Sequence, residues 1–147
     1  MDFDTEVKLT LYAMIARDAR MPASQSIAFE LAKPIADIES AFARLYSKRL
    51  LVLEPGSSAK IRMAPPFSGI ETPFPVVVGD RRFYADCVWD ALGVAAALHA
   101  DAVVDATDGH TGERITLEVR DGKPLPRDCI AHFAVPAAHW WDDIIYT

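Results

Sequence analysis

The sequence predicts an α+β protein in which a small helical module precedes a β-rich core. Two observations support this prediction. Residues 1–65 contain three stretches with helical spacing of apolar residues and then a hairpin pattern, whereas residues 66–147 contain mainly strand patterns. A Pro-rich segment without a period, residues 63–75, lies between them and indicates a linker. We therefore expect a winged helix-turn-helix-like module at 1–65 and a mixed β-sheet core with helices at 66–147.

The three helices of the module follow from the positions of apolar and helix-capping residues. Apolar residues at helical spacing predict an amphipathic helix over residues 5–19. Ser24 is expected to cap a second short helix that runs to about Leu31, and Pro34 is expected in the first turn of a third. The apolar stripe of the third helix comprises Ile35, Ile38, Phe42 and Leu45.

A β-hairpin is predicted after the third helix, where residues 51–53 and 60–63 flank a Pro-Gly turn. Three helices and a hairpin often bind DNA, but Asp37 and Glu39 lie near the start of the third helix, where base-reading side chains would be. Acidic side chains are unfavourable next to phosphates, and residues 1–65 carry a net charge of only +1. We therefore favour a structural or docking role for the module over DNA binding.

The second half alternates strand patterns with one helical stretch. Residues 86–98 are rich in Ala and Leu and predict a helix, interrupted near Gly93. A turn sequence at 107–112 joins two of the strands into a hairpin. The strand-like runs are 74–78, 102–106, 115–119 and 129–135. Cys129 is expected to be a buried residue of the last run.

Composition limits the class of protein. Hydrophobic residues make up 51% of the chain, so a packed core is expected, and no run of 18 apolar residues predicts a membrane span. The acidic N-terminus lacks the basic start of a secretory signal, and two cysteines do not suggest a disulfide scaffold. We expect a cytoplasmic protein with reduced thiols. The net charge of −6 argues against a strong nucleic-acid footprint.

The tetrapeptide Cys87-Val88-Trp89-Asp90 is the strongest candidate for chemistry. On a helix, residues three apart share a face, so the thiol and the carboxyl can meet at one point. Thiolate is the ligand that soft metals prefer, and a carboxyl can carry a proton. The alternative is a buried Cys87 that packs as a small hydrophobe beside a solvated Asp90. The four histidines show no spacing typical of a metal site.

Two segments carry a resemblance to a known family. The run Arg81-Arg82-Phe83-Tyr84-Ala85-Asp86-Cys87-Val88-Trp89-Asp90-Ala91-Leu92 resembles the active-site segment of bacterial organomercurial (alkylmercury) lyases. The later run His132-Phe133-Ala134-Val135-Pro136-Ala137-Ala138-His139-Trp140-Trp141-Asp142-Asp143-Ile144 looks like a signature of lyase-like members. The resemblance implies protonolysis of a carbon–mercury bond. It also implies that Cys87 matches the first catalytic cysteine and Asp90 the catalytic aspartate, both as mercury ligands.

The resemblance further implies the partners of the reaction. No cofactor is expected; Hg(II) would be the bound product, and an external thiol its acceptor or co-reductant. The expected partners are an organomercurial small molecule and cellular thiols or a mercuric reductase, with neither DNA nor a membrane. The lyases place a second cysteine just after the segment that matches residues 142–147, so we expect a truncated chain. Cys129 does not lie at that second position.

Two other functions remain open at the level of sequence. The winged-helix module could make the chain a regulator that senses a soft metal or a thiol ligand through the same pocket. Alternatively, the chain could be a lyase-like binding module without catalysis. Whether the chain is an enzyme thus depends on the chemistry of Cys87 and Asp90.

Overall fold

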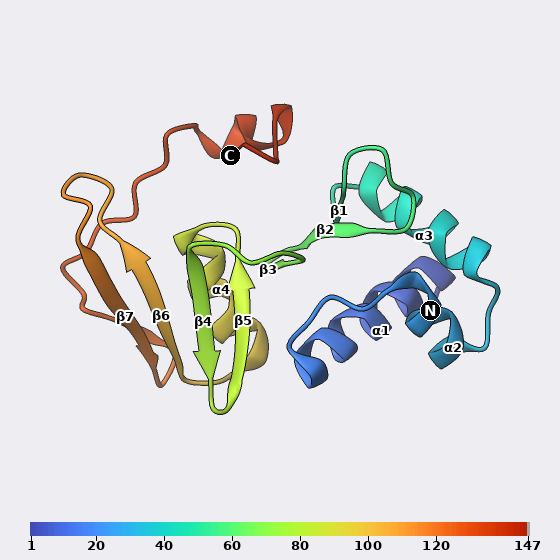
Figure 1. The fold of residues 1–147 in the computed structure, drawn as a ribbon, viewed down its shortest axis with the longest axis horizontal. Coiled ribbons are helices and arrows are strands. Elements are labelled where there is room, and N and C mark those ends of the chain that lie inside the picture. Colours follow the sequence, from blue (N-terminus) through green and yellow to red (C-terminus); the bar gives the residue numbers. More distant parts are fainter. Residues whose placement is uncertain (147) are drawn as a thin grey trace.

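The computed structural model describes residues 1–146 and confirms the α+β class (Figure 1). The first part consists of α1 (Phe3–Asp18), α2 (Ser24–Leu31) and α3 (Ile35–Ser47). Helix α1 begins after Asp2, whose carboxylate accepts the backbone N–H of Thr5 at 3.1 Å. The three predicted helices are therefore present, with ends that differ by a few residues at most.

Two details of helix capping differ from the sequence expectation. The residue before α2 is Ala23, and Ser24 is the first helical residue, so Ser24 is not the cap. Its hydroxyl instead lies 3.3 Å from a carboxylate oxygen of Glu39 in α3, and this tertiary contact replaces the capping role. Pro34 precedes α3 with an extended backbone rather than lying in its first turn.

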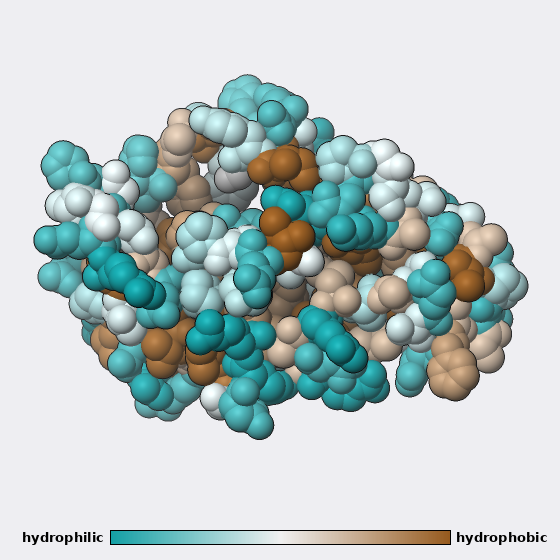
Figure 2. Space-filling view, in the orientation of Figure 1, coloured by the Kyte–Doolittle hydropathy of each residue, from teal (hydrophilic) through white to brown (hydrophobic). Residues whose placement is uncertain are grey.

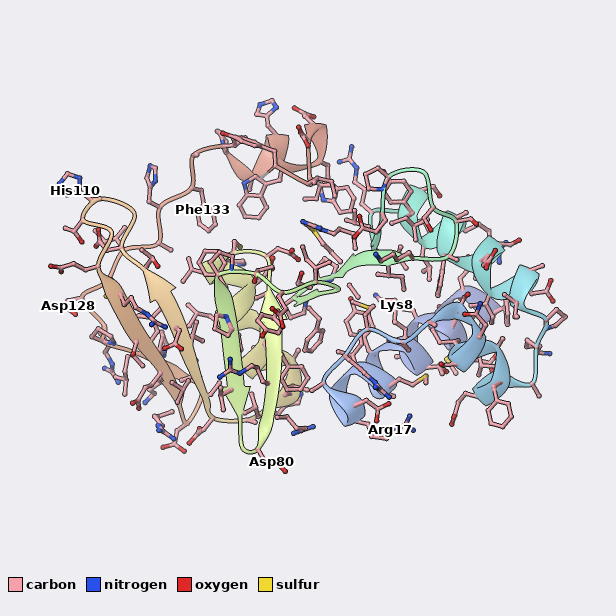
Figure 3. All side chains as sticks on the ribbon, in the orientation of Figure 1. Lys8, Arg17, Asp80, His110, Asp128 and Phe133 are labelled. Carbon is pink, nitrogen blue, oxygen red and sulfur yellow. The ribbon has the colours of Figure 1, made fainter. Side chains whose placement is uncertain are left out.

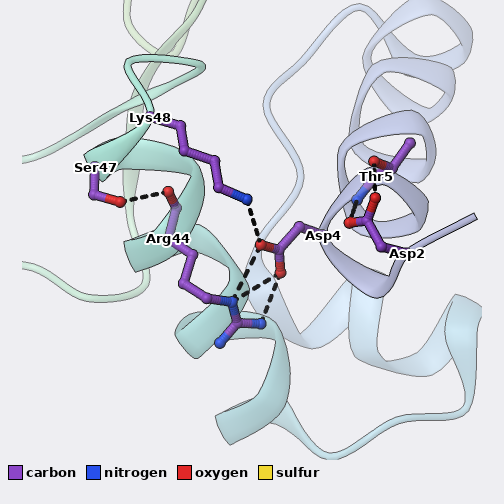
Figure 4. A network of polar contacts seen from close by, with 6 residues as sticks. All are labelled: Asp2, Asp4, Thr5, Arg44, Ser47 and Lys48. Carbon is purple, nitrogen blue, oxygen red and sulfur yellow. Dashed lines mark hydrogen bonds and ion pairs between the residues drawn. The ribbon is translucent and has the colours of Figure 1, made fainter.

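The apolar stripe of α3 packs inward as predicted, except at its start. Ile38, Phe42 and Leu45 are buried, whereas Ile35, the first helical residue, is 42% exposed. A polar network also joins α3 to α1 (Figure 4). Arg44 donates to Asp4 from Nη2 at 2.7 Å and from Nε at 2.9 Å, and Lys48 Nζ lies 3.2 Å from the same carboxylate. Because the Asp4 side chain is only 11% exposed, this network fixes the angle between the two helices.

A three-stranded antiparallel sheet follows the helices, with β1 (Val52–Leu53), β2 (Ile61–Ala64) and β3 (Phe67–Ser68). The predicted hairpin is β1–β2. The segment expected to be a linker instead contains β3, because residues 63–64 pair with residues 67–68. Phe67 of β3 then contacts Phe83 of the second part, with ring centroids 5.6 Å apart. One hydrophobic cluster continues from α1 to the second sheet.

The second sheet has the strand order β5-β4-β6-β7-β8 (Figure 1). Its strands are β4 (Phe74–Val78), β5 (Arg81–Ala85), β6 (Ala102–Thr107), β7 (Arg114–Arg120) and β8 (Lys123–Leu125). Every pair among the described residues is antiparallel, so the expectation of a mixed sheet is wrong. The reason is that the helical crossover from β5 places β6 beside β4, and β4 runs against both strands.

Helix α4 (Val88–Leu98) forms this crossover and covers one face of the sheet. Ala91, Val94 and Ala95 are buried there against the inward-facing residues of β4 and β6. The helix is not interrupted at Gly93. A Cβ at Gly93 would lie 3.1 Å from Cβ of Pro66, so the glycine lets α4 approach the β2–β3 turn closely.

The remaining chain, residues 126–146, is called the C-terminal segment below. It crosses back over the sheet and ends in a 3₁₀-helix, η1 (Ala137–Asp142) (Figure 1). The strand expected at 129–135 is absent, and Cys129 is exposed rather than buried. None of these residues is buried, so the run lacks the packed face that would stabilise a strand. Within residues 1–146, no helix has the length and apolar character needed to cross a membrane.

Candidate active site

Cys87 lies where β5 ends and α4 begins. Its backbone is extended (φ −149°, ψ 174°), and its sulfur accepts the backbone N–H of Asp90 at 3.4 Å. Cys87 therefore occupies the N-cap position of α4, which usually belongs to Ser, Thr, Asp or Asn. The capping contact aims the sulfur at the first turn of the helix.

Asp90 extends from this first turn toward the same sulfur. Cys87 Sγ and Asp90 Oδ2 are 3.6 Å apart, a distance at which the thiol donates to the carboxylate. Both side chains are half-buried. The structure thus brings together the two residues that the sequence singled out, in the geometry needed for passing a proton from sulfur to oxygen.

Burial and charge oppose ionisation at this pair. Burial raises the pKa of the Cys87 thiol, and the nearby Asp90 carboxylate raises it further. The backbone N–H groups of Asp90 and Trp89 act in the opposite direction, as expected at a helix N-terminus. Burial also raises the pKa of Asp90, although the hydrogen bond from Cys87 partly offsets this. The free site accordingly holds a protonated thiol beside a carboxyl that accepts a proton more readily than an exposed one.

Two further titratable groups surround the pair and were missed in the sequence. Asp86 Oδ1 accepts a hydrogen bond from Ser68 at 3.0 Å, and burial raises the pKa of Asp86 to about 6. Tyr12 of α1 donates to the Pro65 carbonyl at 2.8 Å. Burial and the charge of Asp90 raise the pKa of Tyr12 to about 12. The position of Asp86 directly before Cys87 was a visible signal, whereas Tyr12 reaches the site only through the fold.

The other residues of the motif do not join the thiol–carboxyl pair. Arg82 is exposed on β5, and Tyr84 donates to Glu71 at 3.3 Å. Trp89 is 58% exposed. The only contact described for its ring is with Phe133 of the C-terminal segment. In the described chain, residues 1–146, no three His, Cys, Asp or Glu side chains are grouped as a metal site would require.

Cys129 and Cys87 follow strands at opposite edges of the sheet. Cys87 follows β5 at one edge, and Cys129 follows β8 at the other. Four strand spacings correspond to about 19 Å. Figure 3 places Asp128, the preceding residue, beside β7. Both cysteines are free, and Cys129 is exposed.

Comparison with known proteins identifies the family. The family model described as alkylmercury lyase (MerB) matches residues 67–147, which is more than half of the chain. The chain belongs to the alkylmercury lyase family. The matched residues include the whole of α4, its N-terminal Cys87–Asp90 pair and the C-terminal segment.

A solved structure supports this membership over a longer part of the chain. The structure, titled as the crystal structure of the mercury-bound form of MerB2, superposes with a TM-score of 0.63 at 26% sequence identity. The match covers 83% of this family member and 61% of the MerB2 chain, so this chain spans less than two thirds of that protein. No curated protein sequence matches this chain.

Proposed function

We propose that the chain catalyses protonolysis of carbon–mercury bonds, with Cys87 as the mercury ligand and Asp90 as the proton carrier. The observation that carries the proposal is the 3.6 Å contact between Cys87 Sγ and Asp90 Oδ2, in a chain that belongs to the alkylmercury lyase family. Thiolate is the donor that a soft metal ion prefers, and the departing carbon needs a proton. Both requirements meet at the N-terminus of α4.

The first step is ligand exchange at mercury. The organomercurial R–Hg–X loses X⁻ as Cys87 sulfur binds mercury, and the thiol proton passes to the Asp90 carboxylate. The hydrogen bond between the two groups supports this proton path. The raised pKa values of Cys87 and Asp90 suit the exchange, because the thiol keeps its proton until mercury arrives and Asp90 can then hold it.

The second step breaks the carbon–mercury bond. The bonding electron pair leaves with carbon, which takes the proton from Asp90 to give the hydrocarbon R–H. Mercury remains Hg(II) and stays bound to Cys87 sulfur, and the regenerated Asp90 carboxylate becomes its second ligand. No electron is transferred, so the step needs no redox cofactor.

Release of mercury requires another thiol. Two external thiols, or one dithiol, displace the two protein ligands and carry Hg(II) away as a bis-thiolate, because sulfur binds Hg(II) more strongly than carboxylate does; of the two thiol protons, one is released to solvent. The other thiol proton returns to Cys87, which restores the starting thiol. Cellular thiols or a mercuric reductase are the acceptors that we propose, with no resident cofactor in the protein.

Benzene release from phenylmercury tests the proposal directly. We expect release from the parent protein in the presence of a dithiol, strong loss in Cys87→Ser, and loss in Asp90→Asn with mercury binding retained. Cys129→Ser is the matched control for the cysteine, and Asp80→Asn, in the exposed β4–β5 turn, is the control for the aspartate. Both controls should behave as the parent.

Binding of Hg(II) or phenylmercury separates ligand from proton carrier. If Cys87→Ser binds as tightly as the parent while Cys129→Ser does not, the assignment of the mercury ligand is wrong. If Asp90→Asn releases benzene at the parental rate, Asp90 has no part in the proton transfer. If the parent binds phenylmercury but never releases benzene, the chain is a binding module.

A further inference from the structure

The C-terminal segment lies over the start of α4 without joining the core. Figure 1 shows it running back above β6, β4 and α4 toward the N-terminal module. None of its described residues is buried, and none belongs to the hydrophobic cluster of the protein. Contacts other than core packing must therefore hold it in this place.

Aromatic rings supply these contacts. The rings of Trp89 on α4 and Phe133 on the segment meet edge to face, with centroids 6.3 Å apart and an interplanar angle of 72°. Phe133 in turn contacts Trp140 at 5.1 Å, and the Trp140 indole N–H donates to the Val135 carbonyl at 2.8 Å. Further along, the guanidinium of Arg49 lies 5.9 Å from the ring centre of Trp141. The segment thus contacts α4 through Phe133 and the helical module through Trp141.

The rings leave apolar surface uncovered at the N-terminal end of α4, the end that carries Cys87. Trp89 is 58% exposed and Phe133 37% exposed. An edge-to-face pair leaves ring faces free for a further aromatic group. Figure 2 shows an opening between the segment and the core, and Figure 3 shows Phe133 pointing from the segment toward α4. Trp89 belongs to the first turn of α4, two residues after Cys87.

The expected ligand of Cys87 fits this surface. Two-coordinate mercury holds its two ligands in line, so the organic group of a bound organomercurial extends away from the sulfur. A phenyl group can reach and pack against neighbouring rings, whereas a methyl group has little surface and no ring to offer. Aromatic pairs gain energy beyond the area they bury, so the two ligands should differ in affinity.

We propose that Trp89 and Phe133 form the binding surface for the aryl group of an organomercurial held at Cys87, and that they make the protein prefer arylmercury over methylmercury. This inference rests on the proposed role of Cys87 as the mercury ligand. Phe133 comes from the C-terminal segment and Trp89 from the helix that carries the thiol. Specificity therefore depends on the segment staying above α4.

Competitive binding of phenylmercury and methylmercury tests the inference. The Cys129→Ser Asp90→Asn double variant serves as the background, so that Cys87 is the single thiol and bound phenylmercury is not cleaved while glutathione is present. Each mercurial is titrated against a fixed concentration of glutathione, and occupancy is read by intact mass. Phe133→Leu and Trp89→Leu should each weaken phenylmercury binding about tenfold, a change that corresponds to about 1.4 kcal/mol, and change methylmercury binding by less than about twofold. The two substitutions lie on different elements, Phe133 on the C-terminal segment and Trp89 on α4. The same effect in both variants would therefore not be explained by displacement of the segment in one of them.

Ile130→Ala is the matched control, because Ile130 belongs to the same segment, is 92% exposed and makes none of the ring contacts. It should bind both mercurials as the background protein does. Equal weakening of both mercurials in the ring variants, or no weakening of either, overturns the inference while leaving the proposed function intact. Binding that persists in Cys87→Ser overturns the proposed function, and with it this inference.

Discussion

Removing the charge of Asp90 should make the Cys87 thiol more reactive. Asp90→Asn keeps the shape of the side chain but removes the carboxylate that lies 3.6 Å from the sulfur. Two unit charges at that distance repel by about 1 kcal/mol even at the dielectric constant of water, and by more in a half-buried site. This energy corresponds to a roughly sevenfold increase in the thiolate population at a pH below the thiol pKa.

The gain in alkylation rate should be smaller than the gain in thiolate. A thiolate of lower pKa is a weaker nucleophile, which reduces the net increase to about threefold. The assay is the rate of iodoacetamide reaction with Cys87 between pH 6 and 10, in the Cys129→Ser background. Burial and Asp90 raise the pKa of Cys87, so the alkylation rate of the parent should increase only at high pH. In Asp90→Asn the same increase in rate should occur at lower pH. The curve of alkylation rate against pH for Asp80→Asn should match that of the parent. An Asp90→Asn rate equal to or below the parental rate at pH 7.5 would refute the electrostatic coupling.

Three other outcomes are expected. Gly69→Ala should destabilise the protein by about 1–3 kcal/mol in urea unfolding, because the added Cβ would lie 2.4 Å from the Ile61 carbonyl oxygen; Gly109→Ala, where a Cβ meets nothing within 4 Å, should be neutral. Asp4→Asn should lower the free energy of unfolding by about 1–3 kcal/mol at pH 7, because the substitution removes a carboxylate whose pKa Arg44 holds below its usual value. A carboxyl whose pKa is lowered by folding stabilises the protein at pH values above its unfolded pKa, and this stability is lost as the pH falls. The effect of Asp4→Asn should therefore be smaller at pH 3 than at pH 7. An equal effect at both pH values would contradict the role of the Asp4 charge. Phenylmercury turnover should accelerate with excess dithiol, and multiple turnovers without any added thiol would disprove the need for an external acceptor.

The docking role of the N-terminal module stays a prediction. Glu39, one of the two acidic residues near the start of α3, lies within 3.4 Å of the hydroxyls of Ser24 and Ser58 and so contributes to packing within the module. Tyr12 of α1 also contacts the turn before β3, which links the module to the core near Cys87. Nanomolar, sequence-selective binding to duplex DNA at physiological salt would contradict the expectation that the module does not bind DNA.

The sequence predicted those features that depend on local patterns. Helix α3 was visible because its apolar residues recur at helical spacing, and the β6–β7 hairpin because alternation flanks a turn sequence. The Cys87–Asp90 pair was visible for the same reason, since residues three apart meet on a first helical turn whatever the rest of the chain does. The family resemblance rested on the segment around this pair, residues 81–92, and on residues 132–144, and the family model that matches residues 67–147 confirms it.

Tertiary contacts decided what local patterns could not. Residues 129–135 have strand-forming side chains, but no sheet or helix face buries them. They are therefore an exposed part of the C-terminal segment, and Cys129 is exposed with them. Gly93 suggested a break in α4, yet the close approach of Pro66 makes it a packing residue. The raised pKa values of Cys87 and Asp90 arise from burial, which the sequence of the motif does not contain. A pairing between neighbours in the chain can be inferred from spacing alone, whereas burial depends on which distant segments come to cover a residue, and only the folded chain determines that.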